Sequence, residues 1–128
     1  MFRITFFVSL FVVSYLWPAC PVQASKAEVD FAHQVAPILK EFCGKCHIGD
    51  KKKGGLSFNN RESLLNGGES GKNLFPGKPE MGDFLARIVS GDVQLQMPPD
   101  GKRVPQEKVE IIKKWILEGA KWDAGYSL

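Results

Sequence analysis

Five consecutive residues, Cys43-Gly44-Lys45-Cys46-His47, constrain this chain more than any other segment. A C-x-x-C-H motif is typical of covalent c-type haem attachment. Two thiols one helical turn apart can each bond to one vinyl group of a haem, and the adjacent imidazole then lies under the iron as an axial ligand. We therefore predict that Cys43 and Cys46 hold a haem covalently and that His47 is a ligand of its iron.

A CxxC pair also occurs in dithiol redox sites and in zinc sites, so the motif leaves alternatives. Zinc usually needs two further ligands, and outside the motif only His33 and Cys20 supply the usual nitrogen or sulfur donors. The histidine next to Cys46 favours haem attachment over both alternatives. A non-haem CxxC redox module or a zinc module is the less favoured alternative.

The N-terminal residues predict export. Residues 4–17 form an apolar run, and an A-x-A-like cleavage site ends at Ala24. We expect residues 1–24 to be a signal peptide and the mature protein to lie in the periplasm. The apolar run is shorter than the roughly 20 residues that a bilayer span needs. The alternative is a membrane anchor, either through an uncleaved residue 4–17 segment or through acylation of Cys20.

Length and charge limit what the mature chain can be. Residues 25–128 comprise 104 residues, which suits one small domain. The formal net charge of the whole chain is +3, and the leader contributes only Arg3 to it. Two haem propionates would offset most of what remains. The charge therefore supports neither a nucleic-acid partner nor binding to a membrane surface.

The apolar pattern predicts helices separated by loops rich in glycine and proline. Asp30 can cap a first helix that leads into the motif and buries Phe31, Val35, Ile38, Leu39 and Phe42. Pro37 lacks a backbone donor, so it either kinks this helix or begins a second one. A short helix is expected over residues 61–65, with Asn59 or Asn60 as its cap.

Two further helices are expected in the C-terminal half. Phe84, Leu85, Ile88 and Val89 form an apolar stripe that ends before Ser90-Gly91. Pro105 opens the clearest helix, which ends at Gly119 and carries Val109, Ile112, Trp115 and Ile116 on one face. No strand pattern, internal repeat or long linker is evident, and we predict one all-α domain over residues 25–128.

Met97 is the best candidate for the second axial ligand. A thioether is a soft, neutral ligand that raises the reduction potential, which suits electron transfer. Pro98 and Pro99 stiffen the segment after it, so that a loop presents the sulfur. Met97 as a simple core residue and His33 as a second histidine ligand are the alternatives. His33 lies ten residues before Cys43, about 15 Å away in a continuous helix.

Several segments together resemble the planctomycete-type cytochrome c domain, and the resemblance covers nearly the whole mature chain. The segments are Val35-Ala36-Pro37-Ile38-Leu39, Cys43-Gly44-Lys45-Cys46-His47, Gly54-Gly55-Leu56, Gly67-Gly68-Glu69-Ser70-Gly71, Pro76-Gly77-Lys78-Pro79-Glu80, Met97-Pro98-Pro99 and Trp115-Ile116 with Gly119, Ala120 and Trp122. The resemblance implies a small cytochrome c-like fold around a single covalent haem c, with His47 and Met97 as axial ligands. That family is familiar as a module of larger proteins, whose other functions do not transfer to this chain.

These observations predict a one-electron carrier rather than an enzyme. The alternative is a haem sensor or a small haem enzyme whose sixth ligand is labile. The partners of a carrier are a redox donor and a redox acceptor. Lys45 and residues 51–53 concentrate positive charge beside the motif, which indicates either an acidic redox partner or only a solvated loop.

Overall fold

The computed structural model describes residues 27–128. The expected signal peptide and Cys20 lie outside the described residues. Within residues 27–128 the regular structure is helical, and the only pairing of extended backbone is an isolated bridge between Gly68 and Gly71. The predicted all-α fold class is confirmed.

Helical segments of different lengths follow one another along the described chain. In order they are the π-helical turn η1 (Phe31–Val35), α1 (Ala36–His47), the 3-10 turn η2 (Lys53–Gly55), α2 (Arg61–Asn66), α3 (Phe84–Val89) and α4 (Gln106–Leu117).

The segment that leads to the motif is two helices joined end to end. The Asp30 side chain accepts a hydrogen bond from the His33 backbone N–H and so caps η1, as the sequence predicted. Pro37 is the second residue of α1, where its missing N–H removes no intrahelical bond. Of the two expectations for Pro37, the structure therefore shows the start of a second helix. The π-helical turn before it was not predicted.

The shorter helices lie where the apolar pattern placed them, with two refinements. Asn60 is the cap of α2, and it forms a reciprocal capping box with Ser63. In α3, Phe84 and Ile88 are buried, but Val89, which the sequence placed in the same apolar stripe, is 58% exposed. Val89 is the last residue of α3 and lies about 100° around the helix from Ile88, so it faces away from the core.

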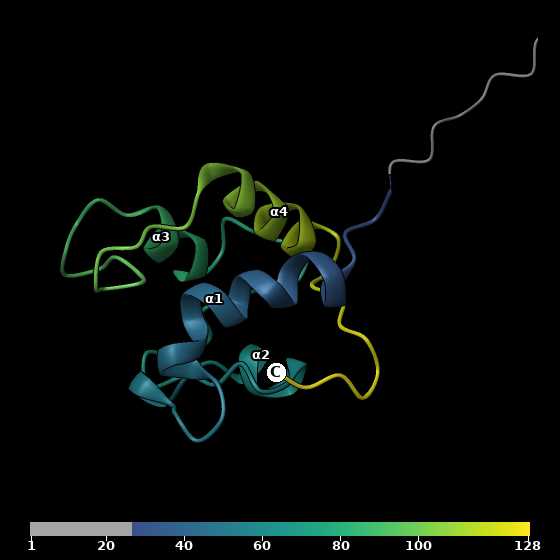
Figure 1. Ribbon diagram of the computed structural model, residues 1–128, viewed down its shortest axis with the longest axis horizontal. Coiled ribbons are helices and arrows are strands. Elements are labelled where there is room, and N and C mark those ends of the chain that lie inside the picture. Colours follow the sequence, from purple (N-terminus) through teal and green to yellow (C-terminus); the bar gives the residue numbers. More distant parts are fainter. Residues whose placement is uncertain (1–26) are drawn as a thin grey trace, which may run out of the picture.

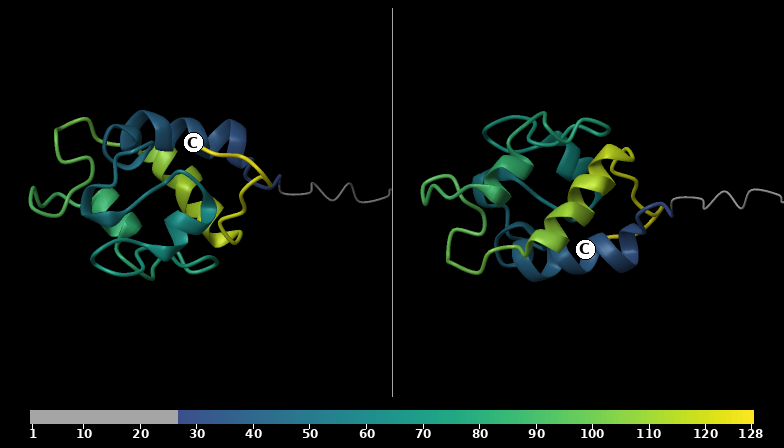
Figure 2. Two further views of the ribbon diagram at one scale, coloured as in Figure 1. Left: turned by 90° about the horizontal axis from the view of Figure 1, so that it is seen from below. Right: turned by 90° about the horizontal axis from the view of Figure 1, so that it is seen from above.

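The helices surround α1. In Figure 1, α1 crosses the middle of the molecule, α3 and α4 lie on one side of it, and α2 lies on the other. The two views of Figure 2 show that α4 runs obliquely to α1. Helix α4 packs against η1 and against α3. This arrangement leaves the C-terminal end of α1, where the motif lies, facing the loops that follow α3.

An aromatic cluster closes the core at the other end of α1. The Phe31 ring stacks on Trp122 with a centroid distance of 3.8 Å and lies 5.7 Å from Trp115 and 5.5 Å from Tyr126. Trp115 is 1% exposed, and its indole N–H donates to the Lys121 carbonyl at 2.6 Å. Such pairs stabilise a core beyond the apolar area that they bury. The cluster fixes α4 on the helix that carries the motif.

Within residues 27–128, the helices are too short or too polar to cross a lipid bilayer.

Candidate functional site

The motif occupies the last turn and a half of α1. Cys43, Cys46 and His47 all line one cavity, and both cysteines are free thiols. Burial, and to a smaller extent the neighbouring Cys46, raise the pKa of the Cys43 thiol to about 12. Cys43 is therefore protonated at physiological pH in the folded chain. Helical spacing places the two sulfur atoms on the same side of α1 as His47.

Contacts on two sides orient the His47 ring. Its Nδ1 lies 3.1 Å from the Leu56 carbonyl oxygen, and a carbonyl can only accept, so Nδ1 carries the proton. Nε2 then keeps a free lone pair, which is the state in which a histidine binds a metal. The Phe58 ring stacks beside the imidazole at 5.2 Å, and the Phe58 backbone N–H donates to the His47 carbonyl at 2.7 Å.

Neither of these supports for His47 was predicted from the sequence. Gly54 and Gly55 both have a positive φ, and the turn that they form brings Leu56 back toward the end of α1. Gly68 packs on the same turn so closely that a Cβ atom at position 68 would lie 2.3 Å from the Gly54 carbonyl oxygen. Glycine at this position allows two loops to touch behind the histidine.

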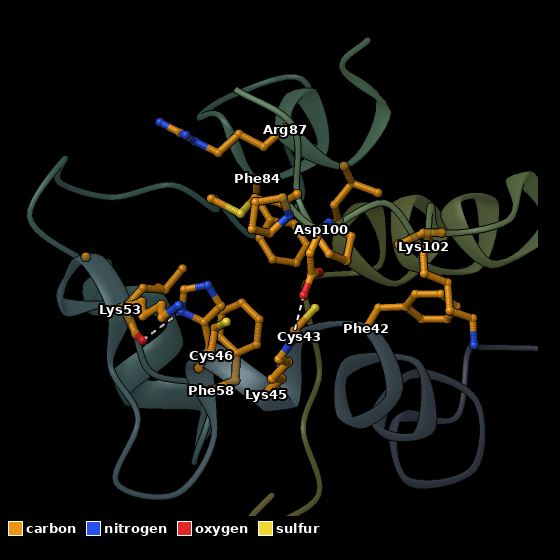
Figure 3. A pocket seen from close by; sticks show the side chains of 18 of the residues that line it. Phe42, Cys43, Lys45, Cys46, Lys53, Phe58, Phe84, Arg87, Asp100 and Lys102 are labelled. Atoms are coloured by element: carbon orange, nitrogen blue, oxygen red, sulfur yellow. Dashed lines mark hydrogen bonds and ion pairs between the residues drawn. The ribbon is translucent and has the colours of Figure 1, made fainter. Parts of the chain in front are cut away.

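The cavity beside the motif is large and mainly apolar. Its volume is about 260 Å³, whereas a single water molecule needs roughly 10–15 Å³. The apolar lining comes from α1, α3 and the loops on either side of them: Phe42, Leu56, Phe58, Phe84, Ile88, Met97, Pro98, Pro99 and Val104. Figure 3 shows Cys43 and Cys46 pointing into the space between Phe58 and Phe84. Such a cavity suits a large, flat organic group rather than a bare metal ion.

Met97 reaches the same cavity from the opposite side. It lies in the loop between α3 and α4, and its backbone N–H donates to the Arg87 carbonyl at the end of α3 at 2.9 Å. The residue is half-buried and lines the cavity together with His47. The structure thus brings two thiols, an imidazole and a thioether to one apolar cavity. This donor set fits a covalently held haem with one nitrogen and one sulfur ligand.

The remaining candidate ligands lie elsewhere. The His33 side chain is 84% exposed and pairs with Asp30, with 2.9 Å between Nδ1 and Oδ2. It does not line the cavity, and neither does Met81, which is 41% exposed. Within residues 27–128 there is no group of three or more His, Cys, Asp or Glu side chains that could hold a metal ion. The described residues therefore do not form the set of donors that a zinc site needs.

Ion pairs cross the mouth of the cavity. Lys45 Nζ lies 2.6 Å from an Asp100 carboxylate oxygen, which joins the motif to the Met97 loop (Figure 3). This contact lowers the pKa of Asp100 and raises that of Lys45. On the other side, Glu41 pairs with Lys102 at 2.6 Å and with Lys108 at 2.7 Å. Asp100 was not among the residues singled out from the sequence.

The comparison with protein families agrees with this geometry. Residues 43–101, which run from the first cysteine of the motif to just beyond the Met97 loop, match the family model described as Planctomycete cytochrome C. This segment is therefore similar to the planctomycete cytochrome c family. The resemblance noted in the sequence is thus confirmed. No curated protein and no solved structure gave a significant match to the chain.

The match to this family indicates the general function of the matched segment. A cytochrome c domain holds haem c through thioether bonds and uses the haem iron in electron transfer. Cytochrome c domains are typically found outside the cytoplasm.

Proposed function

We propose that this protein is a one-electron carrier that holds a single haem c, with His47 and Met97 as the axial ligands of the iron. The observation that carries the proposal is the meeting of Cys43, Cys46, His47 and Met97 on one apolar cavity, although Met97 is 50 residues beyond His47 in the chain. The CxxCH motif occurs once in the sequence, which supports one haem.

Each of the four residues has a distinct role in this proposal. Cys43 and Cys46 each add their sulfur to one carbon of a vinyl group and their hydrogen to the other carbon, so no oxidant or reductant is consumed. His47 supplies Nε2 to the iron, and the Leu56 carbonyl holds the ring in place through Nδ1. Met97 supplies a neutral sulfur, which favours the ferrous state. Haem supplies the redox couple, and the apolar lining limits access of water to it.

We also propose that the protein works outside the cytoplasm after loss of residues 1–24. The A-x-A-like site at Ala24 and the typical location of cytochrome c domains support this location. An electron carrier needs no substrate site, so we propose no catalytic residues. N-terminal sequencing of the exported protein tests the cleavage site, and a mature chain that keeps residues 4–17 would contradict it.

A visible spectrum of the purified holoprotein tests the ligand set. The ferric form is expected to show the weak far-red band of a methionine sulfur on iron, and the ferrous form is expected to resist carbon monoxide. Rapid carbon monoxide binding by the wild type would instead support a sensor or a small haem enzyme with a labile sixth ligand. Acid–acetone extraction tests the thioether bonds, because covalent haem stays with the polypeptide. Replacing both Cys43 and Cys46 with alanine is expected to release it.

A further inference from the structure

A smaller recess opens off the main cavity on the His47 side. It has a volume of about 130 Å³ and shares six lining residues with the main cavity: His47, Lys53, Gly54, Leu56, Arg87 and Met97. The residues that it does not share come from the loop between α2 and α3 and from the residue before α3: Gly68, Ser70, Gly71, Asn73 and Asp83. The main cavity is lined mostly by apolar residues, whereas six of the eleven residues that line this recess have polar side chains.

Asn73 is the one deeply buried polar side chain in the recess. The residue is 9% exposed, and its Oδ1 has no hydrogen-bond partner among the described residues. A buried amide without a partner costs roughly 1–3 kcal/mol. The two ends of an asparagine amide are nearly equivalent in shape, so a half-turn of the side chain replaces the acceptor with the Nδ2 donor. Asn73 can therefore donate a hydrogen bond to a ligand that only accepts hydrogen bonds.

The Asn73 backbone is held firmly in place. The Phe84 backbone N–H donates to the Asn73 carbonyl at 2.9 Å, which ties the loop to the start of α3. Gly82 has a φ of +78° and lies so close that a Cβ atom there would be 2.3 Å from the same carbonyl oxygen. Only glycine fits this position. The amide is thus presented to the recess from a fixed backbone.

On the recess side of the mouth, one cation has no ion-pair partner among the described residues and another keeps free hydrogen-bond donors. Lys45 and Lys102, on the other side of the cavity, each pair with a carboxylate at 2.6 Å. Lys53 forms no ion pair within the described part of the chain. The Arg87 Nε donates to Asp83 at 2.5 Å, but no described residue accepts a hydrogen bond from its terminal NH2 groups. In Figure 3, Lys53 and Arg87 lie on the side of the cavity away from Lys102.

On the basis of the proposed haem site, we propose that this recess binds the two propionate carboxylates of the haem. Asn73 donates its amide N–H to a propionate oxygen, and Arg87 and Lys53 supply the positive charge. Carboxylates are acceptors with negative charge, and the recess offers a buried donor with two cations beside it. The recess would then hold the edge of the haem that lies opposite the thioether bonds.

The pH dependence of the reduction potential tests this assignment. An amide donor and nearby cations favour an ionised propionate, and a cation within about 4–6 Å lowers a carboxyl pKa by roughly 1–3 units. The other charged or titratable groups on the recess are Asp83, which Arg87 already neutralises, and His47. We therefore expect the potential of the wild-type holoprotein to change little between pH 5 and pH 8.

Asn73→Leu and Arg87→Gln remove one favourable contact each. In both variants the propionate pKa is expected to rise into the measured range. The potential then falls as the pH rises through that pKa, because the new negative charge stabilises ferric iron. Asn73→Asp keeps the shape of the side chain and adds a second carboxylate, so its shift is expected to be larger. This variant keeps the test available if Asn73→Leu does not fold.

Lys52→Gln is the matched control. It removes the same charge from the same loop as Lys53→Gln, but Lys52 lines neither cavity. Lys53→Gln is expected to change the pH profile, and Lys52→Gln is expected to leave it unchanged. A flat profile in the Asn73 and Arg87 variants, with haem bound and the far-red band intact, would overturn the propionate assignment alone. A wild type without haem would overturn the proposed function itself.

Discussion

Replacing Phe58 with alanine is expected to destabilise the holoprotein strongly and to loosen its proximal histidine. Phe58 is 2% exposed and fills the space between the His47 ring, at 5.2 Å, and the Phe84 ring, at 5.8 Å. Phe→Ala changes at such sites cost about 3–5 kcal/mol, because the lost transfer free energy adds to the cost of the cavity left behind. We take about 4 kcal/mol as the expected loss.

That loss is large for a domain of this size. Domains of about 100 residues have unfolding free energies of about 5–15 kcal/mol, and 1 kcal/mol shifts their melting temperature by about 4 °C. A melting temperature lower by about 16 °C is therefore expected for Phe58→Ala. The measurement is denaturant and thermal unfolding of the holoprotein, followed by tryptophan fluorescence and by the Soret band.

Phe75→Ala is the control for this prediction. Phe75 is half-buried and lies outside the core cluster, so the substitution removes the same atoms from a place where they contribute little to packing. Its expected loss is well under half of that for Phe58→Ala. If the two variants lose equal stability, or if Phe58→Ala loses less than about 1 kcal/mol, the ring is not the packed support for His47 that the structure indicates.

Three further predictions concern the ligand loop and the charges around the cavity. Met97→Ala is expected to abolish the far-red band, lower the reduction potential and admit carbon monoxide, whereas His33→Ala changes none of these; the reverse result would indicate two histidine ligands. Replacing the lysines at positions 51–53 with glutamine should flatten the salt dependence of electron transfer to an acidic partner, measured as second-order rates, and equal slopes would leave them as solubilising residues. Lys45→Gln removes the partner that lowers the pKa of Asp100, so the variant is expected to be less stable than the wild type at neutral pH and equally stable once the pH has fallen through that pKa. Denaturation midpoints at neutral and acid pH measure the difference in stability, and a difference that persists in acid would contradict an origin in this ion pair.

The local features of the site could be predicted from the sequence. Cys43, Cys46 and His47 are neighbours in the chain, so their relation to one haem needs only a helix. The helices themselves follow from apolar spacing and from side chains such as Asp30 and Asn60 that cap them. Met97 could be singled out because its chemistry and its prolines are visible without a fold.

The groups that hold these residues in place could not be predicted in the same way. Leu56 acts on His47 through a backbone carbonyl, which leaves no mark in the identity of residue 56. Asp100 meets Lys45 only because the loop before α4 folds back over the motif, 55 residues away along the chain. In both cases the contact that positions the side chain joins separate segments of the chain, and apolar periodicity within one segment does not reveal such a contact.

The start of the described chain bears on how a redox partner could reach the cavity. Residues 27–29 lie against the C-terminal end of α4, where Lys114 Nζ donates to the Ala27 carbonyl at 2.6 Å and the Val29 N–H donates to Glu118 at 2.8 Å. The motif lies at the opposite end of α1, which is about 18 Å long (Figure 1). A leader or lipid that kept the N-terminus at a membrane would therefore hold the molecule by the end remote from its cavity. The haem edge would then face the surrounding solution, where a diffusing protein could exchange electrons with it.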